Sequence, residues 1–349
     1  MTQVVACPAQ AMVEFISMTL LVFKVNQLGD NVVYLPVIQS LVAAHPDWRI
    51  VVFTSPTAAR LYEVCCPSVE VHTHSTAEFN SAWRHPAKLW NLWHEIRLIK
   101  ADACLLGDDQ GSVAHLLASY SGVRLSVGTL TSRVKLNALI HVGLPPQGEE
   151  HVAMHNWRIA QALMRHLNIP ALPETMPPPD LSAFGREVHG SLVMHAGASR
   201  AYKRWPLERS IELANRLSAL HAVTWFDQGA ENEAMLKPEV RRVKPGTLDE
   251  LVRLMAGAKY FIGNNSGPMN LASALGVPGT IFNGPSTPNW DPPWHAEDFD
   301  ILRDPTLSCQ PCDLLTHPVN ICQNKQQPMA CMNRWGVEEV FRRVQRRLG

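Results

Sequence analysis

Two loops of this chain place charged side chains directly after predicted buried strands, where they could act on a substrate. Asp30 follows the apolar run 19–25 and could be a general base for a substrate hydroxyl, or it could simply cap the next helix. Small residues and cations meet at 195–206, so a diphosphate could approach the backbone while Lys203 or Arg204 supplies charge. The alternative for this second loop is a solvated basic segment.

Two further segments also follow predicted strands. In 227–231 a carboxylate such as Glu231 could accept hydrogen bonds from ribose hydroxyls, or it could lie at the start of the next helix. The stretch 260–278 reads as a buried strand, a Gly- and Asn-rich turn and a helix, with Ser266 as a suitable N-cap and Pro268 in the first turn. The free N–H groups of such a helix start favour phosphate, although an ordinary strand-to-helix connection has the same sequence features.

Four of the eight cysteines are clustered near the C-terminus, at Cys309, Cys312, Cys322 and Cys331. In a protein expected in the cytoplasm, such a cluster suggests a metal ion rather than disulfides. Four thiolates suit zinc or iron. The alternatives are free thiols or disulfides formed on isolation, and a single buried cysteine can be a small hydrophobic core residue.

Strand-like and helix-like patterns alternate through the first half of the chain. Strands are expected at 19–25, 49–54, 69–72, 103–107 and 124–127. Residues 26–30 are predicted to form a loop and residues 31–44 a helix, because apolar residues recur at helical spacing there. This βαβ series predicts a parallel sheet with right-handed crossovers.

Five prolines in 169–180 exclude a helix or central strand, and the alternation restarts after them. Strands are expected at 191–194, 223–226, 260–262 and 279–282, and helices at 207–220, 248–256 and 337–348. The sequence therefore predicts an extension at 1–18, a domain at 19–168, a linker at 169–183, a second domain at 184–304 and a Cys-containing tail with a terminal helix at 305–349. Two doubly wound domains place a ligand in the cleft at the carboxyl ends of their strands.

Composition limits the classes of function. The chain has 349 residues, of which 46% are hydrophobic, and its 31 Lys and Arg balance 31 Asp and Glu, which argues against a nucleic-acid partner. No apolar run approaches the roughly 20 residues of a membrane-spanning helix. Residues 1–17 lack the pattern of a signal peptide, so they are read as an extension before Met18, and the cytoplasm is the expected location.

Four motifs in this order resemble glycosyltransferase family 9, the ADP-heptose:lipopolysaccharide heptosyltransferases. They are the segments 24–30, 195–206, 229–231 and 263–272, and the resemblance spans about 19–293. It implies an α/β protein with the GT-B fold, in which two Rossmann-like doubly wound domains face each other across a cleft. It further implies an acceptor-binding N-terminal domain and a C-terminal domain that binds a nucleotide sugar. The expected reaction is inverting transfer of a heptose from an ADP-linked donor to a lipopolysaccharide core sugar, without a catalytic metal ion.

The resemblance also assigns roles to individual residues. Asp30 corresponds to the proposed catalytic base, Lys203 to the lysine that binds the donor diphosphate, and Glu231 to a glutamate near the nucleoside. The full set of expected donor-binding residues is Gly29, Ala198, Ser199, Lys203, Glu231, Asn265, Ser266, Gly267 and Asn270. Asn265 and Asn270 depart from the family, which usually has aspartate and histidine there. The amides can still donate hydrogen bonds, but a role that needs a carboxylate or an imidazole is lost.

The cysteine tetrad resembles the iron-binding cysteines of autotransporter heptosyltransferases, relatives that modify protein serines. Protein O-heptosylation is therefore an alternative to lipopolysaccharide transfer. A non-catalytic nucleotide-sugar-binding protein is an alternative of another class. A GT-B-fold epimerase is disfavoured because no carboxylate-rich set is apparent beyond Asp30 and Glu231.

One segment of the first half, 83–100, mixes tryptophans with Lys and Arg. Such a segment could meet a phosphorylated lipid or a membrane surface, which would place the protein at the inner face of the inner membrane. The alternative is a helix with Trp90 and Trp93 in the core and its cations in solvent.

Overall fold

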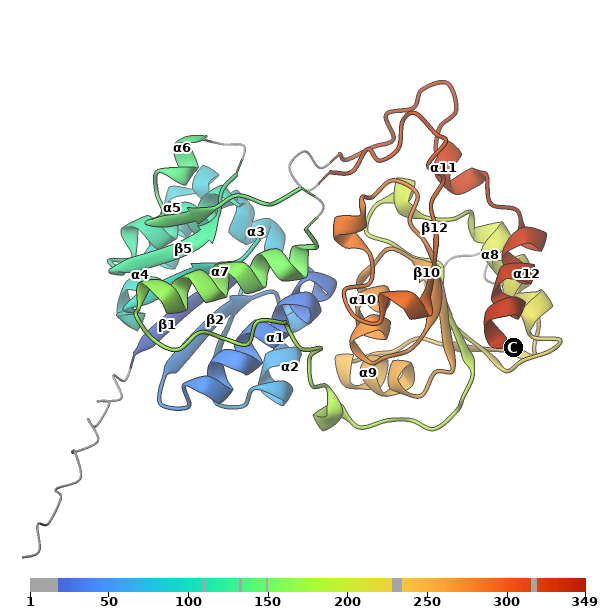
Figure 1. The fold of residues 1–349 in the computed structure, drawn as a ribbon, viewed down its shortest axis with the longest axis horizontal. Helices are drawn as coiled ribbons and strands as arrows, with labels where there is room; N and C mark the ends of the chain where they lie inside the picture. The colour runs from blue at the N-terminus through green and yellow to red at the C-terminus, as the bar shows by residue number, and fades with distance from the viewer. Residues whose placement is uncertain (1–17, 109–110, 132–133, 149, 228–233, 315–318) are drawn as a thin grey trace, which may run out of the picture.

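The computed structural model describes residues 18–108, 111–131, 134–148, 150–227, 234–314 and 319–349 (Figure 1). The first half contains a six-stranded sheet in the order β3-β2-β1-β4-β5-β6, and every described strand pair in it is parallel. The strands are β1 Thr19–Lys24, β2 Arg49–Thr54, β3 Glu70–Thr73, β4 Ala103–Leu106, β5 Leu125–Thr129 and β6 Val142–Leu144.

Helices cover both faces of this sheet, which explains why the four residues in the middle of β1, 20–23, are all apolar. Leu20 and Val22 belong to one hydrophobic core, with α1, α2 and α7, whereas Leu21 and Phe23 belong to a second core on the opposite face, with α4 and α5. The helices are α1 Leu28–Ala44, α2 Pro56–Cys65, α3 Thr76–Ser81, α4 Pro86–Ile99, α5 Ser112–Tyr120, α6 Val134–Asn137 and α7 Val152–His166, with a 3₁₀ turn η1 at Ala82–Arg84.

The second half repeats the same topology, with the sheet order β12-β11-β10-β7-β8-β9. Its strands are β7 Leu192–His195, β8 Val223–Phe226, β9 Val240–Val243, β10 Tyr260–Asn264, β11 Gly279–Phe282 and β12 Phe299–Leu302. Its helices are α8 Leu207–Leu217, α9 Leu248–Ala256, α10 Gly267–Ala274, α11 Ala330–Asn333 and α12 Val337–Leu348, with 3₁₀ turns at Ser182–Phe184, Ala201–Lys203, Pro288–Trp290 and Ala296–Asp298. The terminal helix α12 packs on α8, on the side of this half that lies away from the first half (Figure 1).

Each sheet reverses its strand order once, between β1 and β4 in the first half and between β7 and β10 in the second. In open parallel sheets the crevice beside such a reversal, at the carboxyl ends of the strands, is where ligands bind. The loops after these four strands are therefore the segments that the fold places around a ligand.

The two halves touch where α1 meets α10, and Figure 1 shows these helices facing each other across the boundary. Gly29 and Gly267 are in close contact, since a Cβ added to Gly29 would lie 2.8 Å from Gly267 Cα. Beside this contact Arg60 reaches across to Asp249, with nitrogen–oxygen distances of 3.0 and 3.1 Å. The absence of a side chain at Gly29 thus lets the start of α1 come close to the start of α10.

The structure corrects the expected elements in three respects. Helix α1 begins at Leu28, so residues 28–30, expected in a loop, form its first turn. The expected helix at 207–220 ends at Leu217. Three short strands, β6, β9 and β12, form sheet edges that the sequence pattern did not predict.

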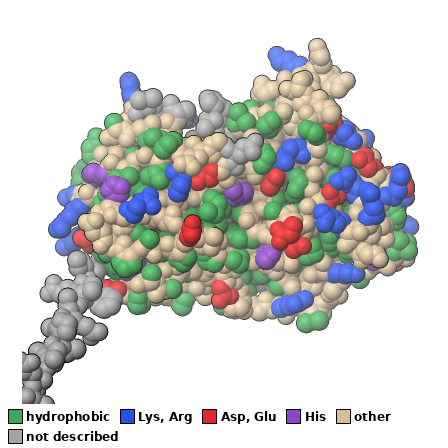
Figure 2. All heavy atoms as spheres, in the orientation of Figure 1, with side chains coloured by type: hydrophobic (Ala, Val, Ile, Leu, Met, Phe, Trp, Pro, Cys, Tyr) green, Lys and Arg blue, Asp and Glu red, His purple; other side chains and the backbone are tan. Residues whose placement is uncertain are grey.

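The surface mixes charges of both signs, with Lys and Arg most frequent at the end that carries α12 (Figure 2). Several of these arginines pair with acids, as Arg343 does with Asp300 and Arg216 with Glu338. Among the helices that the structure describes, none is long and apolar enough to span a bilayer.

Candidate active site in the interdomain cleft

A cleft of about 990 Å³ lies between the two halves, at the carboxyl ends of the central strands. It receives residues from the loops after β1, β4, β7 and β10, together with the turn before α4 and part of the C-terminal tail. All expected site residues that the structure describes, apart from the cysteines, line this cleft: Gly29, Asp30, Ala198, Ser199, Lys203, Asn265, Ser266, Gly267 and Asn270. Glu231, the remaining one, lies outside the described residues.

Asp30 is one of two carboxylates, with Asp108, on the first-half side of the cleft. Burial raises its pKa to about 6 and nearby Asp108 adds to this, while Lys24, the backbone N–H of Gln27 and Lys203 act in the opposite direction. A pKa near neutrality suits a general base, because the carboxylate is then ionised at neutral pH and still basic enough to take a proton. The contact with Gln27, the N-cap of α1, shows that Asp30 also supports the start of this helix.

A buried ion pair between Lys24 and Asp108 lies close to Asp30. The amide of Asn156 donates a second hydrogen bond to Asp108, at 3.0 Å. Burial alone would raise the pKa of Asp108, but Lys24 and Asn156 hold it below its usual value. The pair joins the ends of β1 and β4, and sequence reasoning did not single it out because its partners are far apart in the chain.

The loop after β7 is held in shape by side chains outside the cleft. The guanidinium of Arg204 donates to the carbonyl oxygen of Ala198 at 2.9 and 2.7 Å. The side chain of Asn264, at the end of β10, donates to Ala196 O at 2.8 Å and accepts from the backbone N–H of Trp205 at 2.9 Å. Arg204 therefore braces the loop, and of the two cations considered for a phosphate only Lys203 lines the cleft.

Lys203 forms an ion pair with Asp313, which belongs to the C-terminal tail. Beside it the hydroxyl of Tyr202 donates to the carbonyl oxygen of Val319 at 2.8 Å. Residues of the tail thus line the second-half side of the cleft, an arrangement that sequence motifs gave no reason to expect.

The turn after β10 carries three of the expected donor-binding residues. Ser266 is the N-cap of α10 by position, but its hydroxyl donates to Asn264 O at 3.1 Å and does not cap the helix. The amide of Asn265 donates to the carbonyl oxygen of Trp290 at 2.7 Å. One turn into α10, Asn270 lies against Gly29, since a Cβ there would be 2.9 Å from its Nδ2.

His195 lines the same cleft at the end of β7, although it was not among the expected site residues. Burial, with a contribution from Arg204, lowers its pKa to about 4, so the imidazole is neutral at physiological pH. Within the described part of the chain its Nδ1 atom is buried and has no hydrogen-bond partner.

The four clustered cysteines lie at one end of the tail. Asn324 Nδ2 lies 3.4 Å from the Cys309 sulfur, and the Met329 N–H lies 3.3 Å from the Cys322 sulfur. Burial and the neighbouring cysteines raise the pKa of the Cys331 thiol to about 12. Four clustered cysteines, two of which have an N–H donor near the sulfur, have the donor chemistry of a tetrathiolate site.

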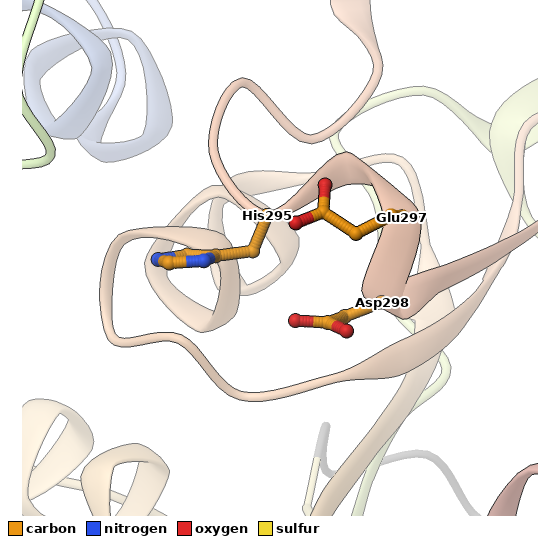
Figure 3. Close-up of side chains that lie close together, drawn as sticks. All are labelled: His295, Glu297 and Asp298. Atoms are coloured by element: carbon orange, nitrogen blue, oxygen red, sulfur yellow. The ribbon is translucent and has the colours of Figure 1, made fainter.

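The sulfur positions are wider than a bound ion requires. Among the described residues no three cysteine sulfurs lie within 4.8 Å of one another, whereas a tetrahedral zinc site needs about 3.8 Å. The group that does meet this distance is His295, Glu297 and Asp298, which is exposed and does not line the cleft (Figure 3). Because exposed acidic groups commonly cluster without an ion, we assign no metal to it.

Comparison with known proteins identifies the family of the chain. Residues 89–320 match glycosyltransferase family 9 (heptosyltransferase). The chain is 29% identical over 147 residues to lipooligosaccharide heptosyltransferase 2 of Campylobacter jejuni, an overlap of 39% of this chain and 45% of that protein. The chain thus matches less than half the length of this curated relative.

Solved structures share the fold. E. coli heptosyltransferase WaaC with ADP superposes with a TM-score of 0.69 at 15% identity, covering 95% of this chain and 100% of that one. TibC of enterotoxigenic E. coli H10407, described as an iron-containing dodecameric glycosyltransferase, superposes with a TM-score of 0.57 at 15% identity, covering 95% and 76%. The GT-B fold expected from the sequence is confirmed, and the match to the family extends over most of the chain. This protein belongs to glycosyltransferase family 9.

Proposed function

We propose that this protein is an inverting glycosyltransferase that transfers a heptose from an ADP-linked donor to a core sugar of lipopolysaccharide. The observation that carries the proposal is the pairing of one carboxylate, Asp30, with one lysine, Lys203, on facing sides of a single cleft. The first is a base for an acceptor and the second a cation for a diphosphate. Family membership supports the choice of heptose and ADP.

In the proposed reaction Asp30 accepts the proton of the acceptor hydroxyl as that oxygen attacks the anomeric carbon of the donor. The attack comes from the face opposite the diphosphate, so the configuration of the sugar inverts. Lys24 and Asp108, which lie close to Asp30, neutralise each other. Of these three groups Asp30 is therefore the one whose charge changes near neutral pH.

The leaving diphosphate gains a negative charge as the glycosidic bond breaks. Lys203 supplies a positive charge, and the start of α10 at Gly267 supplies backbone N–H groups and the positive end of a helix dipole. The loop that contains Ala198 and Ser199 offers further backbone to the same phosphates. No step of this scheme requires a metal ion.

The acceptor would enter over the surface formed by the turn η1 and helix α4. Trp83 and Arg84 line the cleft, and Trp90 lies further along α4. Trp83 is 52% exposed and Trp90 62%, so the interpretation of Trp90 as a core residue was wrong. An exposed aromatic and cationic surface that leads into the cleft supports a phosphorylated, lipid-linked acceptor, which would bring the protein to the inner face of the inner membrane.

For the tail we propose a structural zinc or iron ion held by Cys309, Cys312, Cys322 and Cys331. The ion would cross-link the tail and keep the thiols ionised. Binding would draw the sulfurs closer together than they are in this structure. The tail carries Asp313 into the cleft, so this site would also fix one wall of it.

The cysteine cluster favours one alternative, transfer of heptose to a protein serine. TibC, whose fold this chain resembles, is described as an iron-containing glycosyltransferase, and iron bound by the four cysteines would be a feature in common with it. Stoichiometric iron together with a large homo-oligomer would favour this alternative, and transfer to a lipopolysaccharide core acceptor would contradict it.

Calorimetric titration with ADP, UDP, GDP and dTDP tests the nucleotide. We expect selective binding of ADP, and we expect Lys203→Ala to weaken it by about 1.5–3 kcal/mol, the scale of a hydrogen bond to a charged group. Lys259→Ala is the matched control, since Lys259 is exposed at the opposite end of β10.

Three outcomes would change the proposal. Preference for another nucleotide would discard ADP-heptose, and unchanged affinity in Lys203→Ala would refute the role of that lysine. If no nucleotide binds, the protein is better described as non-catalytic. The amides Asn265 and Asn270 would then be the first residues to test as the cause of the lost binding. Donor hydrolysis or transfer that depends on Asp30 would exclude that description.

A further inference from the structure

The donor side of the cleft contains a carboxylate that no sequence motif predicted. Asp313 lies just beyond Cys312 in the tail, lines the cleft and pairs with Lys203. Its side chain is 8% exposed and that of Lys203 is 18% exposed, so the ion pair is largely removed from solvent. The geometry of a buried ion pair is fixed by its surroundings, whereas the side chains of a surface pair are mobile.

Asp313 is held in place by its backbone and its neighbours. The backbone N–H groups of Cys312 and Asp313 both donate to Pro285 O at 3.0 Å, and Asp313 forms a β-bridge with Ser286. The loop that contains Pro285 follows β11, the neighbour of β10 in the sheet. Asp313 is therefore anchored to the same sheet edge that carries the expected phosphate-binding turn.

The turn after β10 presents an amide to this cleft and no carboxylate. Asn265 occupies the place where the family usually has aspartate, and its amide donates to Trp290 O at 2.7 Å. An aspartate cannot donate this hydrogen bond, and its charge would face the carbonyl oxygen. Asn265 is thus suited to donate to the carbonyl oxygen of Trp290. The carboxylate on this side of the cleft is instead that of Asp313, in the tail.

We infer that Asp313 is a donor-binding residue that recognises the sugar of the nucleotide sugar by accepting hydrogen bonds from its hydroxyls. The inference rests on the proposed function. Lys203 binds the diphosphate there, and the sugar is bonded directly to that diphosphate, so a carboxylate in contact with Lys203 lies within reach of sugar hydroxyls. Besides Lys203, the Asp313 carboxylate accepts from the Ser286 hydroxyl and the Val319 N–H, both at 3.4 Å. A carboxylate has about four acceptor positions, so a position is left for a sugar hydroxyl.

A carboxylate beside a diphosphate also weakens binding of the diphosphate by electrostatic repulsion, and the affinity for free ADP measures this effect. Free ADP gains nothing from Asp313 and is repelled by its charge, whereas a nucleotide sugar gains hydrogen bonds from its hydroxyls. Asp313 therefore favours the nucleotide sugar over the released nucleotide. This predicts a role in selectivity, which a purely structural residue would not have.

The test compares the affinities of ADP-heptose and ADP in the full-length protein by calorimetry. In Asp313→Asn we expect the ratio of ADP-heptose affinity to ADP affinity to fall about 10-fold or more, the scale of a hydrogen bond to a charged group, while ADP binds as well as before or more tightly. Asp304→Asn is the matched control: its side chain is 7% exposed and pairs with Arg334, but it does not line the cleft. This variant should keep the wild-type ratio.

A ratio that stays at the wild-type value in Asp313→Asn, or that falls equally in Asp304→Asn, overturns the inference. Should Asp313→Asn not fold, Asp313→Glu keeps the charge and moves it toward the ligand. It should then lower ADP-heptose affinity more than ADP affinity, and equal effects on both would again overturn the inference. If the wild-type protein binds neither ligand, the proposed function fails and the inference fails with it, whereas normal binding with an unchanged ratio refutes the inference alone.

Discussion

Replacing Asp30 by asparagine should make the protein more stable at neutral pH, although it would remove the base of the proposed reaction. In the folded protein the pKa of Asp30 is raised from 3.8 to about 6, chiefly by burial. The ionised carboxylate is therefore disfavoured by folding. A shift of about 2 pKa units corresponds to about 3 kcal/mol of unfolding free energy at a pH well above 6.

The sign and the pH window follow from this shift. Below pH 3.8 the carboxyl group is protonated in both states, so its ionisation has no effect on stability. Between pH 3.8 and about 6 the unfolded chain loses the proton while the folded chain keeps it, and stability falls as the pH rises. Above about pH 7 the loss is complete. Asp30→Asn, which cannot ionise, should therefore gain stability relative to wild type across this window.

Urea denaturation followed by circular dichroism, at intervals from pH 4 to pH 8, measures the effect. We expect the midpoint difference between Asp30→Asn and wild type to be close to zero at the acid end and to increase to a plateau above neutrality. The exposed Asp47 of the same domain provides the control variant Asp47→Asn, which should show no such increase. A difference that does not depend on pH, or a variant that is less stable at pH 8, would refute the assignment of a raised pKa to Asp30.

Three further predictions concern the same cleft and the tail. The kcat/KM of the wild-type enzyme should fall about tenfold per pH unit below about pH 6, because Asp30 must be ionised to act as a base; a flat profile contradicts this role. Gly29→Ala should force the two halves apart, since its Cβ would lie 2.8 Å from Gly267 Cα. Small-angle scattering should therefore show a larger radius of gyration for this variant. An unchanged radius argues against a closed arrangement in solution. Elemental analysis should find zinc or iron in stoichiometric amount, lost in Cys322→Ser but kept in Cys65→Ser; metal-free wild-type protein would dispose of the site.

The central strands and the residues directly after them could be predicted from the sequence because their signal is local. β1, β2, β8, β10 and β11 consist mostly of buried apolar residues, as expected of strands covered on both faces, and their predicted bounds differ from the structure by at most two residues. Once these strands are known, the topology places the loops after them together. Asp30, Lys203 and Ser266 could therefore be assigned to one cleft without any knowledge of distances.

Three of the four edge strands, β6, β9 and β12, and the long-range pairs gave no such signal. β9 contains Arg241 and Arg242, which are exposed at a sheet edge, so its sequence does not resemble a buried strand. β6 has only three residues, all of them half-buried. The pair of Lys203 with Asp313 joins a motif to a tail that lies far along the chain, and only the packing of the tail on the loop after β11 determines it.

The balanced net charge of the chain raises the question of how it could hold a diphosphate. Three cationic side chains line the cleft, Arg84, Arg200 and Lys203, and α1 and α10 both begin there, so backbone N–H groups and the positive ends of two helix dipoles add to the positive charge. The two helices belong to different halves, so both dipoles act on one anion only when Gly29 and Gly267 are in contact. An anion bound between them stabilises that contact, and loss of the anion removes the stabilisation. Donor binding and closure of the two halves are therefore expected to be coupled, with each free energy contributing to the other.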